Sequence, residues 1–298
     1  MAQQAATPSS SDDEEEEEVA CFERDTESFM LRRRRFTFPG LPPVVLNQDF
    51  VSVEGTGGAV WRPSIEFSEF VCSEEGRRCL PLAGKSVLEI SSGLGLGAIV
   101  AWHLGAAPVV ATDLGSKDGP MALLARNVSE NCGPRAVATP QPSPGRTSRD
   151  HSRGGEAGSA PEGGSAEDEG APPPGRRRPP PPPPPSVQSL RWGDKAQLAD
   201  ALRKFDGFGP DVVLACDVVF DDALLPALLE TLAEAACRTT RGGGRPSLCV
   251  SHQKRNRRRE DSFFAALAKR IGGGGQLRMV HQQNDLSVLM FTYLMVRH

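Results

Sequence analysis

Apolar positions along this chain follow two patterns: short continuous runs, and longer stretches with an apolar residue every three or four positions. The short runs indicate buried strands, and the longer stretches indicate amphipathic helices. Strands are expected at 86–90, 109–112, 187–190, 211–216, 247–251, 277–281 and 288–296. Helices are expected from Pro63 to about Val71 and at 96–104, 120–131, 224–236 and 260–271, with one more ending near residue 205. One or two further strands are expected between Phe36 and Val53.

Strands and helices alternate until the last two strands, which follow each other directly. Such alternation predicts an α/β fold of Rossmann-like type, with an open, mostly parallel sheet and helices on both faces. The final pair of strands predicts a C-terminal antiparallel hairpin. In folds of this class, ligands bind beyond the carboxyl ends of the strands.

Two segments lack any periodic apolar pattern. Residues 1–31 contain an acidic run at 12–18, and we expect a disordered tail there. Residues 133–186 are rich in proline, glycine and serine and end in the run Pro179–Pro185, so we expect a disordered insertion within a single domain, 32–298. The proline run favours polyproline II and is a candidate ligand for SH3- or WW-type partners, with an inert surface insertion as the alternative.

The overall composition narrows the class of protein. A net charge of −4 gives no case for nucleic acid as a partner of the whole chain, and no apolar run is long enough for a membrane. The seven cysteines show no C-x-x-C spacing, which favours reduced thiols in an intracellular protein. We expect a cytoplasmic protein, with the nucleus as a second location if Arg32–Arg35 is a nuclear address and not a solvated strand edge.

The most informative stretch begins at the strand 86–90. Gly93, Gly95 and Gly97 follow it and allow a sharp turn whose bare backbone a ligand can approach, and a helix comes next. Strand, glycine turn and helix open a nucleotide-binding βαβ unit. Asp113 ends the next strand, twenty residues after Gly93, where a carboxylate can accept hydrogen bonds from ribose hydroxyls or cap a turn.

Two cofactor classes compete for this loop. A dinucleotide fingerprint has the spacing G-x-G-x-x-G, whereas this chain has G-x-G-x-G with Glu89 in the preceding strand. A carboxylate near the loop repels phosphate and suits a cationic ligand. S-adenosylmethionine carries an amino group and a sulfonium but no phosphate, so the charge pattern favours it.

The segment from Glu89 to Gly97 resembles motif I of the seven-strand, class I methyltransferases. Three later segments resemble signatures of one branch, methyltransferase family 16, the methyltransferase-like protein-lysine methyltransferases. The resemblance extends from about Phe36 to Arg297, apart from the insertion, and implies a protein substrate. The three segments are Val60-Trp61-Arg62-Pro63-Ser64, Leu190-Arg191-Trp192-Gly193 and Asp217-Val218-Val219-Phe220.

The resemblance implies a role for each matching residue. The glycine loop and Glu89 would hold the methionine and ribose end of the cofactor, and the two tryptophans would line its adenine and methionyl sides. Asp217 to Phe220 would shape the acceptor channel. The cofactor-binding candidates are Trp61, Glu89, Ser91, Gly93, Gly95, Asp113, Trp192 and Cys216, and the catalytic candidates are Asp217 and Phe220.

This chain departs from the branch at two places. Phe220 stands where D-x-x-Y is common, which removes a hydroxyl near the target nitrogen, although some members also carry Phe. Ser91-Ser92 replaces Gly-Ala at a position of close approach. The first departure weakens the case for lysine, but transfer to a lysine of a non-histone protein, which the resemblance implies, stays the leading expectation. The alternatives are methylation of arginine, a small molecule or RNA, and a non-catalytic interaction protein.

Overall fold

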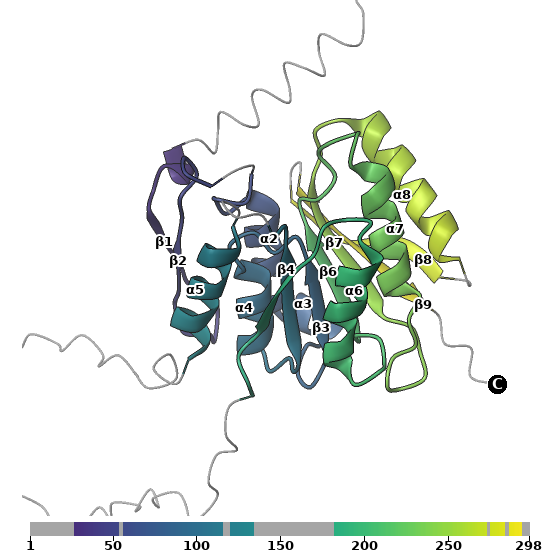
Figure 1. Cartoon of the computed structure of the whole chain (residues 1–298), viewed down its shortest axis with the longest axis horizontal. Helices are drawn as coiled ribbons and strands as arrows, with labels where there is room; N and C mark the ends of the chain where they lie inside the picture. Colours follow the sequence, from purple (N-terminus) through teal and green to yellow (C-terminus); the bar gives the residue numbers. More distant parts are fainter. Residues whose placement is uncertain are drawn as a thin grey trace, which may run out of the picture. The chain divides into compact units, whose positions relative to one another are not determined.

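A computed structural model describes residues 27–53, 56–115, 120–133, 182–272, 275–283 and 286–293. Its centre is a seven-stranded sheet in the order β5-β4-β3-β6-β7-β9-β8 (Figure 1). The strands are β3 (Val87–Ile90), β4 (Val109–Asp113), β5 (Ser186–Ser189), β6 (Val212–Cys216), β7 (Ser247–Gln253), β8 (Gly275–Gln283) and β9 (Leu286–Tyr293).

Five of these strands run parallel, and β9 pairs antiparallel with both β7 and β8. The expected mostly parallel sheet and C-terminal hairpin are therefore confirmed. The register places Val87 of β3 beside Val109 of β4 and Val212 of β6. The carboxyl ends of these three strands consequently meet at one edge of the sheet.

Helices cover both faces of the sheet, as Figure 1 shows. Alternate residues of a strand point to opposite faces, so Val87 packs on one side and Leu88 on the other. The first face is covered by α2 (Arg62–Cys72), α4 (Leu96–His103) and α5 (Met121–Cys132), and the second by α6 (Lys195–Leu202), η1 (Arg203–Phe205), α7 (Leu225–Ala236) and α8 (Arg257–Ile271).

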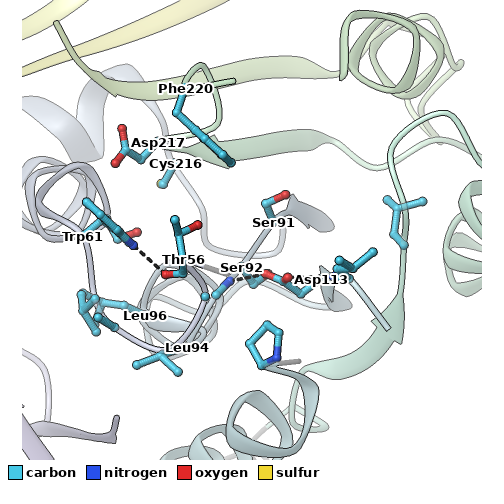
Figure 2. A pocket seen from close by; sticks show the side chains of 18 of the residues that line it. Thr56, Trp61, Ser91, Ser92, Leu94, Leu96, Asp113, Cys216, Asp217 and Phe220 are labelled. Carbon is cyan, nitrogen blue, oxygen red and sulfur yellow. Dashed lines mark hydrogen bonds between the residues drawn. The ribbon is translucent and has the colours of Figure 1, made fainter. Parts of the chain in front are cut away.

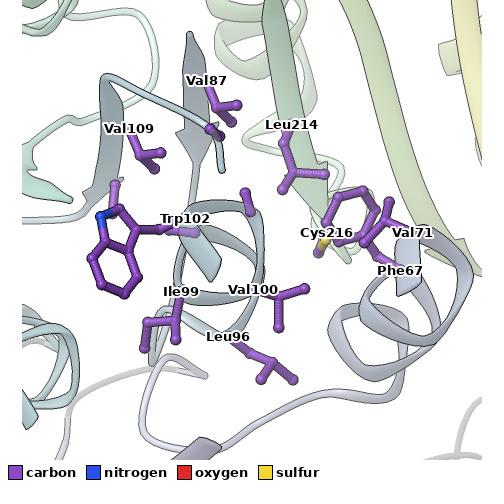
Figure 3. Close-up of a cluster of buried hydrophobic side chains, with 14 of the residues drawn as sticks. Phe67, Val71, Val87, Leu96, Ile99, Val100, Trp102, Val109, Leu214 and Cys216 are labelled. Carbon is purple, nitrogen blue, oxygen red and sulfur yellow. The ribbon is translucent and has the colours of Figure 1, made fainter. Parts of the chain in front are cut away.

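The first of these two cores supports the glycine loop. Figure 3 shows Phe67 of α2 and Val100 of α4 packed toward Leu214 of β6. All seven residues from Leu96 to Trp102 are buried, so α4 lies in the interior and not on the surface. A buried helix of this kind holds its N-terminal turn rigidly against the strand ends.

A two-stranded antiparallel ribbon, β1 (Arg33–Phe36) with β2 (Val44–Asn47), lies beside α5 (Figure 1). The basic cluster is thus part of a strand, and the guanidinium of Arg34 donates to the carbonyl of Val60. Asn127 and Asn131 of α5 join the ribbon to the domain by hydrogen bonds with the backbone of β2. A short helix, α3 (Glu74–Cys79), follows α2 and was not expected.

The two segments without apolar pattern lie largely outside the described residues. For the tail 1–31, only residues 27–31 are described, and Phe29 among them is 1% exposed, packed on Phe50 and Trp61. The folded part thus begins earlier than expected, because Phe29 supplies an apolar anchor. Of the insertion 133–186, residues 134–181 lie outside, and it falls between α5 and β5.

Three further features concern the described part of the chain alone. Six cysteines there are free, and four of them are buried. None of its helices combines the length and apolar character that crossing a bilayer requires. No cluster of His, Cys, Asp and Glu within these ranges has the composition of a metal site.

Candidate functional site

A cavity of about 510 Å³ opens at the carboxyl edge of the sheet, where β3, β4 and β6 end. Its volume lies within the range of small-molecule sites. Figure 2 shows Trp61 and Thr56 on one side of it, Asp113 on another, and Asp217 with Phe220 above them. Its wall draws on the loop before α2, the glycine loop after β3, and the segments after β4, β5, β6 and β7.

Two wall residues that are not glycine have left-handed backbone conformations, which residues other than glycine rarely adopt. Ser91, directly after β3, has φ of 59°, and Asp217, directly after β6, has φ of 56°. Such conformations cost on the order of 1–3 kcal/mol and persist where the surroundings enforce them. β3 and β6 are buried on both faces, so the chain must turn sharply where each strand ends at the cavity. These turns direct the side chains of Ser91 and Asp217 toward the cavity.

Asp113 holds the glycine loop in place. Its Oδ2 accepts a hydrogen bond from Gly93 N at 2.6 Å, and its Oδ1 accepts one from Leu114 N at 2.7 Å. Burial raises the pKa of this carboxyl, and these two N–H donors oppose that shift. Since each carboxylate oxygen has a second lone pair, Asp113 can still accept hydrogen bonds from two ligand hydroxyls.

Glu89 lies beneath the glycine loop and does not line the cavity. Its side chain is buried, and Oε2 accepts a hydrogen bond from Ala98 N, in the first turn of α4, at 2.9 Å. Burial raises the pKa of this carboxyl to about 8, so much of it is uncharged at neutral pH. The sequence suggested that Glu89 acts by its charge. In the structure its main role is to accept the hydrogen bond of an N–H donor at the start of α4.

The two tryptophans form aromatic walls of the cavity. Trp192, after β5, donates from Nε1 to the hydroxyl of Ser91 at 2.9 Å, and its ring centroid lies 6.0 Å from that of Phe220. Trp61 donates from Nε1 to the carbonyl of Thr56 at 2.8 Å. Each indole is thus fixed by its own N–H, which leaves its ring available for contact with an apolar or aromatic ligand.

Asp217 is paired with Arg255, which belongs to the basic run 254–259 expected near this edge but was not among the candidate site residues. Arg255 Nη1 and Nη2 donate to Asp217 Oδ1 and Oδ2 at 2.6 and 2.7 Å, and both side chains are nearly buried. The guanidinium carbon also lies 5.9 Å from the centre of the Trp61 ring. The signal for Arg255 in the sequence was a basic run directly after an apolar strand. When a strand ends at this edge of the sheet, the residues that follow it lie at the cavity.

The structure brings together most of the site residues expected from the sequence. Gly95 lies in the turn behind the cavity, with φ of 88°, and like Glu89 it is not part of the wall. Arg255 and Arg191 also line the wall; the sequence placed them in a basic run and in a family signature but not among the candidate site residues. Those expected and found at the wall are Trp61, Ser91, Gly93, Asp113, Trp192, Cys216, Asp217 and Phe220.

No family model matches this chain, and no curated protein matches it in sequence. Solved structures do match it. The ribosomal protein L11 methylase from Lactobacillus delbrueckii subsp. bulgaricus shares 16% identity over 78% of this chain and 76% of its own, with a TM-score of 0.42. The magnesium protoporphyrin IX methyltransferase from Synechocystis PCC 6803, with bound SAM, shares 10% identity over 77% and 79%, also with a TM-score of 0.42.

A third similar structure is the 16S rRNA N2 G1207 methyltransferase from T. thermophilus in complex with AdoMet and guanosine. It shares 12% identity with this chain, with a TM-score of 0.46. The match covers 88% of this chain but only 51% of the other, so this chain spans about half the length of that protein. The acceptors named for these three proteins, a ribosomal protein, a porphyrin and an RNA, belong to those proteins.

Proposed function

We propose that this protein is an S-adenosylmethionine-dependent methyltransferase whose acceptor is a lysine side chain of a non-histone protein. The observation that carries the proposal is the position of Glu89 under the first turn of α4. The N-terminus of a helix is the usual site for a pyrophosphate, because its N–H groups point at the ligand. Here Glu89 takes the N–H of Ala98, which favours a ligand without phosphate.

The remaining wall residues suit an adenosyl ligand. The second lone pairs of the Asp113 carboxylate can accept the two ribose hydroxyls. Trp192 offers an indole face for the adenine, and Trp61 offers another for the methionyl side. Ser91 and the Gly93 backbone approach the same space closely, since both residues turn in the left-handed region.

S-adenosylmethionine, when bound, supplies a methyl group activated by a sulfonium. The chain's own residues then have to align the acceptor, exclude water and leave the lysine amine unprotonated. Held by Asp113, Trp61 and Trp192, the cofactor would supply an electrophilic methyl carbon and a sulfur leaving group that takes the electron pair of the carbon–sulfur bond. The apolar wall residues Cys216, Phe220 and Leu224 support such a channel, because a desolvated amine loses its proton more readily than one in water.

Two experiments test this function in sequence. Calorimetry with S-adenosylmethionine should show binding to the full chain, and Asp113→Ala should weaken it at least tenfold, because the ribose acceptor is lost. Incubation with methyl-labelled cofactor and a cell lysate should then label protein. Label that nuclease removes would point to an RNA acceptor, label in neither class of polymer to a small molecule, and an absence of cofactor binding to a non-catalytic interaction protein.

A further inference from the structure

The ion pair between Asp217 and Arg255 fills the place where a cationic acceptor would be expected to bind. Among the described residues of the cavity wall, four are charged: Asp113, Arg191, Asp217 and Arg255. Asp113 is engaged by the glycine loop, and the exposed Arg191 repels a cation. Asp217 is thus the carboxylate nearest the expected acceptor channel, and both of its oxygens already accept from Arg255.

Arg255 is itself held firmly from behind. Its backbone N–H donates to Glu260 Oε1 at 2.6 Å, and Asn256 N donates to the same oxygen at 2.9 Å. The buried ring of His252 places Nε2 3.0 Å from that oxygen as well. Asn256 caps α8 through a hydrogen bond from Arg259 N. The turn that presents Arg255 is therefore anchored at several atoms, unlike a loose surface loop.

The geometry of the pair argues against its ready exchange for a substrate ammonium. A planar guanidinium matches a carboxylate with two parallel hydrogen bonds, whereas an ammonium is a point charge that cannot reproduce both. The side chains of Asp217 and Arg255 are only 7% and 10% exposed, so separating them would leave two poorly solvated charges. A lysine ammonium entering the cavity would have to bring about this separation.

We infer that Arg255 is a positioning residue that keeps Asp217 neutralised, so that the acceptor site admits an uncharged amine and does not bind its ammonium form. The inference rests on the proposed function for its meaning in catalysis. An amine can attack carbon only through its lone pair, which the ammonium lacks. A free carboxylate at this place would stabilise the unreactive form, and the guanidinium prevents this.

The inference can be tested with n-butylammonium as a probe for the end of a lysine side chain. Binding to the full chain is measured by calorimetry or by NMR titration, with and without S-adenosylhomocysteine. Arg255→Gln should bind the probe at least fivefold more tightly than the wild type, because Asp217 becomes available. The double variant Asp217→Asn/Arg255→Gln should lose this gain. Arg255→Lys, which keeps a cation but cannot form both hydrogen bonds, should have an affinity between those of the wild type and Arg255→Gln.

Arg257→Gln provides a matched control, since Arg257 is the exposed first residue of α8 and pairs only loosely with Asp261, at 3.6 Å. It should leave binding of the probe unchanged. If Arg255→Gln binds the probe no more tightly than the wild type does, the inference is wrong. If Arg255→Gln does not fold, the double variant decides, because it leaves no unpaired charge. Probe affinity equal to that of the wild type supports the inference, and a loss shows that the ammonium displaces Arg255 in the wild type.

These measurements separate the inference from the proposed function. Absence of S-adenosylmethionine binding would refute the methyltransferase but would leave the comparison of amine affinities readable. Conversely, a probe that displaces Arg255 would refute the role of the ion pair while labelled cofactor could still be consumed.

Discussion

The indole of Trp192 donates a hydrogen bond to the hydroxyl of Ser91 over 2.9 Å, and it joins two cavity loops that are 101 residues apart in the chain. Ser91 occupies a left-handed position that glycine would adopt without strain. The hydroxyl of Ser91 therefore orients the Trp192 ring at the cavity wall. This hydrogen bond helps to offset the backbone strain at Ser91.

Ser91→Ala is expected to weaken binding of S-adenosylmethionine about three- to tenfold, because the Trp192 N–H loses a partner worth ~1 kcal/mol in a half-buried place. Calorimetry on the purified variant gives the affinity. Trp192→Phe removes the N–H instead. The double variant should bind no more weakly than Trp192→Phe alone, and additive losses would show that the two residues act separately.

Glu89→Gln should change how stability depends on pH. The pKa of Glu89 is raised from about 4.5 to about 8, so the folded state binds the proton more tightly than the unfolded state. The contribution of the Glu89 carboxyl to the free energy of unfolding is at its maximum below pH 4.5 and is lost as the pH rises through 8. Glutamine has no carboxyl proton to lose. The free energy of unfolding of the variant, relative to that of the wild type, should therefore rise by about 1–3 kcal/mol as the pH goes from 5.5 to 8.5.

Chemical denaturation at the two pH values measures this difference, and comparison with the wild type cancels the titration of all other groups. A constant difference between the two proteins would show that Glu89 is already ionised in the folded state.

Gly97→Ala is expected to destabilise the protein by about 1–3 kcal/mol, because a β-carbon there would collide with Glu89 Oε1 and touch Leu214. Thermal unfolding gives the loss. Gly244→Ala is the matched control, since its β-carbon would meet nothing closer than Thr240 Oγ1, at 3.9 Å. An equal loss in both variants would show that crowding against Glu89 is not the cause, since Gly→Ala by itself lowers the entropy of the unfolded chain and favours folding.

Trp102→Phe should loosen the entry into β5. The buried indole of Trp102 donates from Nε1 to the carbonyls of Pro182 and Pro183, at 3.2 and 2.9 Å, just before Ser186 begins the strand. Loss of the donor should cost ~1 kcal/mol and speed amide exchange in β5. Hydrogen exchange of β7 serves as the internal reference and should stay unchanged, and equal acceleration in both strands would indicate a global effect.

Local pattern determined most of the fold. The alternation of apolar runs with helical spacing was enough to predict the parallel sheet, its helices and the final hairpin, and every strand of the sheet lies within a few residues of its expected place. Strand ends also pointed to the cavity, because parallel strands deliver their carboxyl ends to one edge. Ser91, Asp113, Trp192 and Asp217 could be named on that basis alone.

Only the tertiary structure decided which side chains meet. Nothing local links Arg255 to Asp217, 38 residues earlier. The contact depends on β7 pairing with β6 and running past its end to Gln253, and on a turn anchored by Glu260. The place of Glu89 was equally hidden. Its carboxyl belongs to the face of β3 that packs on α4, so burial makes it a support of the loop and changes its charge. The periodicity of apolar residues predicts where strands and helices lie, whereas burial and hydrogen-bond partners determine the charge and the role of an ionisable side chain.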